Sequence, residues 1–423
     1  MISLANLVKE AKQSPGAAEE QLLVILRDVF PELNVKIVAI NTGSEVSLNS
    51  INGILTSEGN RRLFFKFHAE EGETQSLIGG EYYRADLLDK LGWNIVKPIA
   101  VSTKPGRQCL VYEERHEPTA YEAFGEQDDL YLRTGAYDGG VVKGLLAAEE
   151  KYLVKAAGIM TRTLEPASPE TASAPLLQLF SHRLIGAGGA TPRVDLFYSG
   201  KLVTLPDGSK AAFDDVAVKK WVVNGCEMPH TLADIIRLSK KHLAVSALAR
   251  GPTVVSHGDD HNGNKFYTAG EFITFDPAFA GRHPALLAPI KGTMHNAPLH
   301  PFWYYKPGRV HDLIQASFSI NADRIEVMHN ADKVLASPLR NQLIGLHMEH
   351  AWQPLLDELA RKNMLPGNWR TIIKCAAFCC PFLAVNMIDP ARLPEHPKLS
   401  LFNLSKCVET FHRPEWEALR PVS

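Results

Sequence analysis

The chain has 423 residues, of which 45% are apolar, so it can bury a sizeable core and form two or three domain-sized units. Its 45 lysines and arginines nearly balance 47 aspartates and glutamates, and a net charge of −2 argues against nucleic acid or an anionic membrane as the main partner. The N-terminal sequence lacks a signal-peptide pattern, and the chain has no run of about 18 uncharged apolar residues, which predicts a soluble, cytoplasmic protein.

The first hundred residues carry most of the β-like sequence. Apolar residues that recur at helical spacing over about 17–30 predict an amphipathic helix that stops at Pro31. Alternating runs, together with the Ser-Glu-Gly-Asn turn signal at 57–60, predict strands in the stretches that follow. The expected strands are 35–40, 46–56, 62–68, 94–101 and 108–112, with a second helix over about 76–91.

From about residue 113 the pattern turns mainly helical. Helices are predicted over 144–164, over 232–250 and through most of 307–390, with a hairpin over 201–213. Beyond Gly251, short apolar strands surround a polar loop. The simplest division is a small β-rich lobe with an N-terminal helix, residues 1–112, and a large helical lobe, residues 113–423, with an insertion around 113–231.

The polar loop after Gly251 carries the most informative residues. It reads His257-Gly258-Asp259, with Asn264 five residues after Asp259, and a strand then leads to Asp276. Magnesium prefers oxygen ligands from one or two carboxylates together with substrate phosphates, and phosphoryl transfer also needs a base that orients the attacking hydroxyl. One loop and one strand supply all three oxygen-bearing groups.

This segment resembles the catalytic segment of the aminoglycoside phosphotransferase and choline kinase family. The resemblance covers about residues 36–115 and 232–285, and it implies a two-lobed, protein-kinase-like α+β fold. It also implies that Asp259 is the catalytic base and that Asn264 and Asp276 bind Mg²⁺. The family commonly has a hydrophobic residue after His-Gly-Asp, whereas this chain has Asp260, which adds a carboxylate beside the base.

Lys66 is the expected phosphate-binding lysine. It lies in the apolar third strand, where a buried charge needs a partner. A kinase-like site has a lysine on this strand, held by a helix glutamate, which predicts pairing with Glu81. Glu73 or Asp86 could take the same role.

Two further segments are expected to contact the nucleotide. Asn49–Gly53, with Ser50, Asn52 and Gly53, resembles the polar loop that covers phosphates in the same family, and Asn41–Ser44 is its competitor. Tyr112 and Glu113 stand where the family's linker hydrogen-bonds adenine through its backbone.

The acceptor side is less defined by the sequence. Arg282 and His283 follow Asp276 closely and could face the acceptor or the γ-phosphate, or could lie in a surface loop. The insertion and the C-terminal helices are expected to form the acceptor pocket. Three cysteines with CxxxCC spacing, 375, 379 and 380, are interpreted as buried reduced thiols because they lack paired metal-ligand spacing.

These observations predict an ATP- and Mg²⁺-dependent phosphotransferase that moves the γ-phosphoryl group to a hydroxyl of a small-molecule acceptor. One alternative is a pseudokinase or nucleotide-binding regulatory module without turnover. A protein kinase is a second alternative, although Asp276 is followed by Pro-Ala-Phe and not by a typical activation segment. A metal cluster of His257, Asp259 and His261 and an inert polar turn are the remaining interpretations of the loop.

Overall fold

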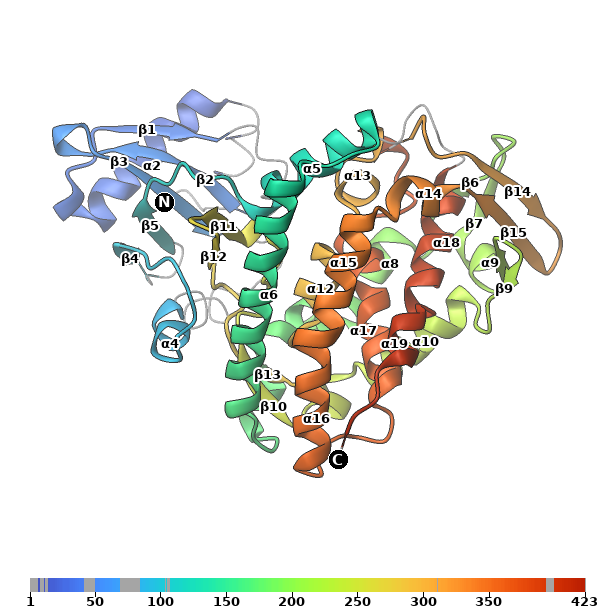
Figure 1. Cartoon of the computed structure of the whole chain (residues 1–423). Coiled ribbons are helices and arrows are strands. Elements are labelled where there is room, and N and C mark those ends of the chain that lie inside the picture. The colour runs from blue at the N-terminus through green and yellow to red at the C-terminus, as the bar shows by residue number, and fades with distance from the viewer. Residues whose placement is uncertain are drawn as a thin grey trace.

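The protein folds into two lobes, seen at the left and right of Figure 1. The computed structural model describes residues 7, 11, 14–41, 50–68, 84–102, 104, 107–309, 311–392 and 399–422. A five-stranded sheet forms most of the small lobe, and the large lobe is mainly helical. This arrangement confirms the predicted two-lobed, protein-kinase-like α+β fold. The boundary placed between residues 112 and 113 stays a prediction.

The sheet of the small lobe is antiparallel, with strand order β1-β2-β3-β5-β4. Helix α2 packs on one face through Leu22 and Leu26, as its amphipathic pattern predicts. Leu63, Phe65 and Phe67 of β3 are buried in the same core, so the period of two places Lys66 on the opposite face. The elements are α2 (Pro15–Val29), β1 (Ile37–Ile40), β2 (Ser50–Thr56), β3 (Arg62–His68), α4 (Ala85–Lys90), β4 (Ala100–Ser102) and β5 (Cys109–Glu113).

The large lobe begins with two helices and then alternates short strands with helices. Its first half contains α5 (Ala120–Thr134), α6 (Gly139–Arg162), α7 (Ser181–Ile185), α8 (Arg193–Phe197), β6 (Leu202–Thr204), β7 (Lys210–Ala212), α9 (Phe213–Ala217), β8 (Lys220–Val223), β9 (Cys226–Glu227), α10 (Leu232–His242) and α11 (Val245–Leu248). The predicted hairpin is confirmed as β6 and β7. Helix α6 stands between the small lobe and the helices at the right of Figure 1.

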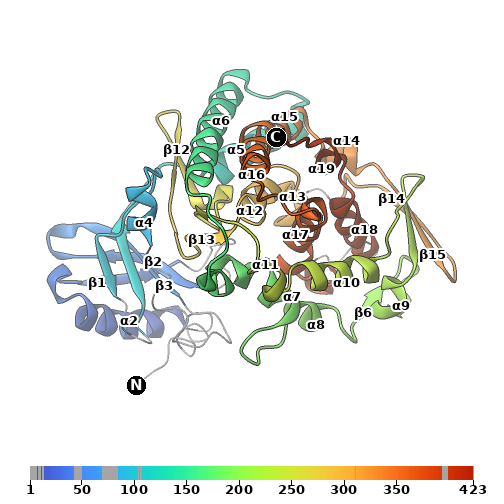
Figure 2. The same ribbon diagram turned by 90° about the horizontal axis from the view of Figure 1, so that it is seen from below.

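The second half of the large lobe contains the His257–Asn264 loop and most of the helical core. Its elements are β10 (Thr253–Ser256), β11 (Lys265–Thr268), β12 (Glu271–Thr274), β13 (Gly281–Pro284), α12 (Ile290–Asn296), α13 (Pro301–Tyr304), β14 (Ala316–Ile320), β15 (Arg324–His329), α14 (Ala331–Leu335), α15 (Pro338–His347), α16 (Gln353–Arg361), α17 (Trp369–Ala384), α18 (Leu399–Phe411) and α19 (Pro414–Ala418). Seen from below, α10, α17 and α18 pack side by side (Figure 2). No helix in the described part of the chain is long and apolar enough to span a membrane.

Three secondary-structure predictions need correction. The region after 307 is not helical throughout, because β14 and β15 form a hairpin whose second strand pairs in parallel with β8. The alternation Ala-Ser-Phe-Ser-Ile in β14 is a strand pattern. The predicted helix 232–250 breaks after His242, where Ala244 adopts ψ 139°. The predicted strand 94–101 does not form as one strand. Ile95 makes an isolated β-bridge with Thr274, and the short strand β4 begins only at Ala100.

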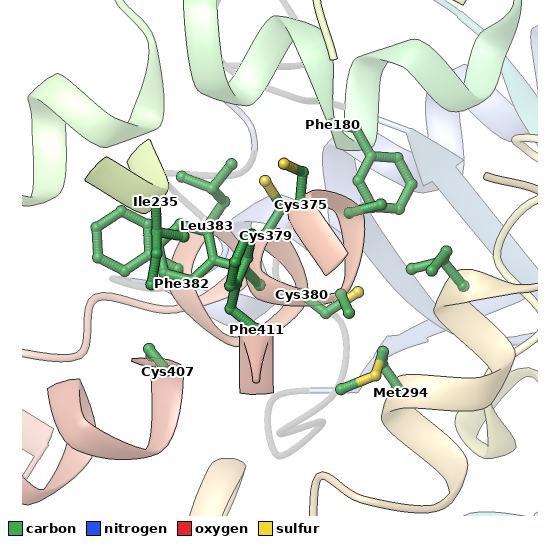
Figure 3. Close-up of a cluster of buried hydrophobic side chains, with 14 of the residues drawn as sticks. Phe180, Ile235, Met294, Cys375, Cys379, Cys380, Phe382, Leu383, Cys407 and Phe411 are labelled. Carbon is green, nitrogen blue, oxygen red and sulfur yellow. The ribbon is translucent and has the colours of Figure 1, made fainter. Parts of the chain in front are cut away.

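The cysteines confirm the interpretation as buried reduced thiols. Cys375, Cys379 and Cys380 lie on α17 without disulfide bonds, and Cys407 is likewise free and buried on α18. Their sulfur atoms lie among apolar side chains (Figure 3). Burial raises the pKa of Cys375 to about 11 and that of Cys380 to about 12. These thiols are packing groups of the core.

Candidate active site

Two local contacts fix the His-Gly-Asp turn. Gly258 has φ +81°, and a Cβ atom placed there would lie 2.3 Å from the carbonyl oxygen of Phe279, so this position requires glycine. The His257 ring is buried, and its Nε2 lies 2.9 Å from the carbonyl oxygen of Phe275, the residue before Asp276. The turn after β10 is thereby joined to the end of the β12 strand.

The β11–β12 hairpin brings the other two predicted residues to the same place. The side-chain amide of Asn264 donates to the carbonyl oxygen of Asp259 at 2.8 Å, and the N–H of Phe275 donates to the carbonyl oxygen of Asn264 at 2.9 Å. Asp276 then has φ +56°, a left-handed conformation that aspartate adopts more readily than most residues. Asp259, Asn264 and Asp276 are therefore brought together by backbone and side-chain hydrogen bonds.

Lys66 reaches this cluster from the small lobe. Its Nζ pairs with Oδ2 of Asp276, and both side chains are only 17% exposed. The two residues are 210 positions apart, so the contact joins the sheet of one lobe to the loop of the other. Figure 1 shows the same relation between the blue sheet and the yellow β11–β12 hairpin. The lysine predicted from its apolar strand thus faces the predicted metal carboxylate.

The donors present fit a magnesium ion better than a transition metal. Oδ1 of Asp276 is buried and has no hydrogen-bond partner among the described residues. A buried carboxylate oxygen needs a partner, and a metal ion would supply one. Asn264 adds an amide oxygen, and Mg²⁺ commonly takes few protein ligands with substrate phosphates completing its shell. No group of three or more His, Cys, Asp or Glu side chains in the described ranges could hold a metal, which contradicts the cluster of His257, Asp259 and His261.

Asp259 lies among positively charged and aromatic groups. Lys291 Nζ lies 3.2 Å from Asp259 Oδ1, and His261 Nε2 lies 3.8 Å from Oδ2. Burial alone would raise the pKa of Asp259. The electrostatic influence of Lys291, and to a smaller extent that of His261 and His295, outweighs burial and holds this pKa well below its usual range. The carboxylate therefore stays ionised at neutral pH and can orient a hydroxyl by accepting its hydrogen bond.

The extra carboxylate, Asp260, lies between α6 and α12, and a Cβ atom added at Gly292 of α12 would lie 2.8 Å from its Oδ1. Tyr152 of α6 donates its hydroxyl to Asp260 Oδ2 at 3.1 Å. Nearby, the fully buried Lys265 pairs with Glu149 of α6 at 3.4 Å and lies 3.9 Å from the centre of the Tyr152 ring. Asp260 and Lys265 therefore anchor the His257–Asn264 loop to α6.

Sequence reasoning missed two residues of α12. Besides Lys291, Asn296 holds the loop from both sides: its Oδ1 accepts from the N–H of Asn262 at 2.6 Å and its Nδ2 donates to the carbonyl oxygen of Asp260 at 3.3 Å. A signal for Lys291 was present, since it follows the apolar run Ala-Leu-Leu-Ala-Pro-Ile. The reasoning that identified Lys66 as a charge in need of a partner applies equally to Lys291.

The segment predicted as a phosphate loop is part of a strand where the structure describes it. Ser50, Asn52 and Gly53 belong to β2, so residues 50–53 are not a loop. A Cβ at Gly53 would lie 2.0 Å from the Ala39 carbonyl oxygen, which explains the glycine by the close approach of β1. The connection between β1 and β2 begins at Asn41, the start of the competing segment, although residues 42–49 lie outside the described residues.

Asn52 nevertheless lies close to the site. It is opposite Lys66 in the β2–β3 register, and its side-chain oxygen accepts from Asn41 Nδ2 at 3.0 Å. On β5, Tyr112 is buried beside Phe64, and the exposed Glu113 pairs with Arg61. Their predicted roles in nucleotide binding stay predictions.

Three remaining predictions concern residues around this cluster. Glu81 and Glu73 lie outside the described residues, and Asp86 is exposed on α4. Arg282 donates to the Thr163 carbonyl oxygen at 2.8 Å and pairs with Glu165 at 3.2 Å, so it fastens β13 to the end of α6. His283 is fully buried, and burial lowers its pKa to about 3. The structure does not bring Arg282 into the cluster around Asp259.

Comparison with known proteins found similarity among solved structures. No family model and no curated protein sequence matches the chain. The amicoumacin kinase hAmiN, in complex with AMP-PNP and Ca²⁺, is 13% identical with a TM-score of 0.40 over 96% of each chain. Aminoglycoside phosphotransferase APH(4)-Ia is 11% identical with a TM-score of 0.39, over 92% of this chain and 98% of its own. Choline kinase from Cryptosporidium parvum Iowa II is 10% identical with a TM-score of 0.35, over 95% and 98%.

Proposed function

We propose that the chain is an ATP- and Mg²⁺-dependent phosphotransferase, similar to aminoglycoside phosphotransferases and choline kinases, that phosphorylates a hydroxyl of a small molecule. The observation that carries the proposal is the contact between Lys66 and Asp276, because this ion pair joins a lysine of the small lobe to the carboxylate that we propose as a metal ligand in the large lobe. Asp259 and Asn264 are tied to the same loop by the hydrogen bond between them.

Each residue has a separate task in this proposal. Asp259 accepts the proton of the acceptor hydroxyl while the bond from that oxygen to the γ-phosphorus forms and the bond from the γ-phosphorus to the β-phosphate oxygen breaks, which releases ADP. Asn264 and Asp276 would hold Mg²⁺, which neutralises charge on the phosphates when it is bound. Lys66 exchanges its contact with Asp276 for the α- and β-phosphates.

The test is Mg²⁺-dependent ATP turnover by the purified protein over a panel of small hydroxyl compounds. Asp259→Asn and Asp276→Ala should each lower turnover by at least about a hundredfold, because one removes the base and the other a metal ligand. Asp323→Asn changes an exposed aspartate on the turn before β15 and should leave turnover unchanged. Circular dichroism checks that all three variants fold.

Three outcomes would contradict the proposal. Unchanged turnover in both site variants would remove Asp259 and Asp276 from the reaction. A thermal shift with ATP but no turnover over the whole panel would instead identify a nucleotide-binding module. Phosphate transfer to added protein and to none of the small molecules would indicate a protein kinase.

A further inference from the structure

His261 is a residue of the His257–Asn264 loop that the proposed reaction does not use. It follows Asp259 by two positions. The N–H of Gly263 donates to His261 Nδ1 at 3.1 Å, so the ring caps the turn that leads to Asn264. The opposite nitrogen, Nε2, faces Asp259 Oδ2 at 3.8 Å. One ring is therefore shared between the backbone of the loop and the proposed base.

The contact with Gly263 fixes the position of the ring proton. A neutral imidazole carries one proton, and the nitrogen that accepts a hydrogen bond is the one without it. Because Nδ1 accepts from an N–H, the proton of His261 is on Nε2, on the side of Asp259. Burial also lowers the pKa of His261, which keeps the ring neutral at pH 7. His261 is therefore a fixed hydrogen-bond donor beside the base.

One oxygen atom can bridge the gap between His261 and Asp259. The distance of 3.8 Å from Nε2 to Oδ2 is too long for a direct hydrogen bond. Two hydrogen bonds of about 2.8–2.9 Å each together exceed this distance, so a single oxygen can contact both atoms at once. The side chains of both residues are 16% exposed, whereas Asp259 Oδ1 is buried beside Lys291. Oδ2 and the Nε2–H of His261 are therefore the groups that an incoming hydroxyl can reach.

We propose that His261 is a further catalytic residue, whose Nε2–H donates a hydrogen bond to the acceptor hydroxyl while Asp259 Oδ2 accepts the proton of that hydroxyl. The inference rests on the proposed function and adds a residue to it. An alcohol oxygen has one proton and two lone pairs. The proton goes to Asp259 and one lone pair accepts from His261, which leaves the second lone pair to form the bond to the γ-phosphorus. The bond from the γ-phosphorus to the β-phosphate oxygen breaks, ADP leaves with that electron pair, and His261 keeps its own proton throughout.

Two substitutions separate this role from the capping of the turn. His261→Asn keeps an acceptor near the position of Nδ1, because asparagine commonly accepts from the N–H two residues on, but its side chain is too short to reach the acceptor hydroxyl. His261→Gln has a longer side chain, whose amide N–H takes the place of Nε2–H, but it loses the acceptor for Gly263. A residue that only caps the turn and a residue that contacts the acceptor therefore predict opposite orders of turnover for the two variants.

The experiment measures turnover and stability of both variants. Mg²⁺-dependent ATP turnover is followed over the panel of small hydroxyl compounds, which includes glycerol, glucose, ethanolamine and serine, and stability is followed by urea unfolding. His261→Asn should lower kcat by at least about tenfold, because the hydroxyl is no longer oriented, and should leave the KM for ATP and the urea midpoint nearly unchanged. His261→Gln should retain most of kcat but have the lower urea midpoint, because the cap is lost. His116→Asn, at a histidine whose side chain is 82% exposed, is the matched control and should change neither kcat nor the midpoint.

The position of the ring proton is tested without turnover. Nitrogen-15 NMR of the histidine side chains distinguishes a protonated from an unprotonated ring nitrogen, and the signals that are missing in His261→Asn belong to His261. We expect an unprotonated Nδ1 and a protonated Nε2 at pH 7. A proton on Nδ1 would overturn the inference.

The outcomes separate this inference from the proposed function. Turnover by the unmodified protein that falls equally in the two variants, or that falls more in His261→Gln than in His261→Asn, would overturn only the inference. Absence of turnover by the unmodified protein over the whole panel would overturn the proposed reaction, and with it the contact between His261 and an acceptor.

Discussion

Replacing Gly258 with alanine tests why the His-Gly-Asp turn has its shape. Gly258 has φ +81°, and alanine in a left-handed conformation costs about 1–2 kcal/mol. In addition, the new Cβ would lie 2.3 Å from the Phe279 carbonyl oxygen, a distance that real Cβ contacts do not reach. Overpacking of this kind costs about 1–3 kcal/mol. We therefore expect Gly258→Ala to lower the free energy of unfolding by about 2–5 kcal/mol.

Gly270 provides a matched control, because it has φ +77° but a Cβ added to it would meet no heavy atom within 4 Å. Gly270→Ala should cost only the conformational part, about 1–2 kcal/mol. Urea unfolding of both variants measures the difference, and their turnover shows whether the displaced turn also moves Asp259. Equal destabilisation by the two substitutions, with equal turnover, would refute the argument from the close contact.

Three further predictions concern the support of the site and the core. Burial raises the pKa of Glu149, but Lys265 and His347 outweigh it and hold this pKa at about 2, below the ordinary 4.5. The resulting stabilisation is present above pH 4.5 and is lost as the pH falls towards 2, so Glu149→Gln should lower stability at pH 7 by about 3 kcal/mol and flatten the acid side of a pH–stability curve. Asn296→Leu leaves the buried N–H of Asn262 without its acceptor and should lower stability by about 1–3 kcal/mol and turnover at least tenfold, whereas Asn296→Asp, which keeps the acceptor, should lose less. In a thiol-labelling assay, Cys226 should react rapidly in the native protein and the five buried cysteines only on unfolding; rapid labelling of more than one thiol would contradict the described core.

Local patterns in the sequence predicted much of the small lobe and of the proposed site in the His257–Asn264 loop. The apolar run of β3 identified Lys66 as a charge that needs a partner, because this conclusion depends only on adjacent residues. The short spacing of Asp259 and Asn264 likewise required only one loop to bring them together. The prediction of a loop over residues 50–53 was wrong, because the small polar residues of β2 look like a turn unless the neighbouring strand is known.

The sequence by itself determined which residues could be charged, apolar or strand-forming, since these are properties of side chains and of their immediate neighbours. Tertiary structure decided which distant groups meet. The pairing of Lys66 with Asp276, of Lys291 with Asp259 and of Asn296 with the loop depends on how two lobes and a short buried helix pack. A buried charge requires a partner, but only packing selects that partner from among the many carboxylates of the chain.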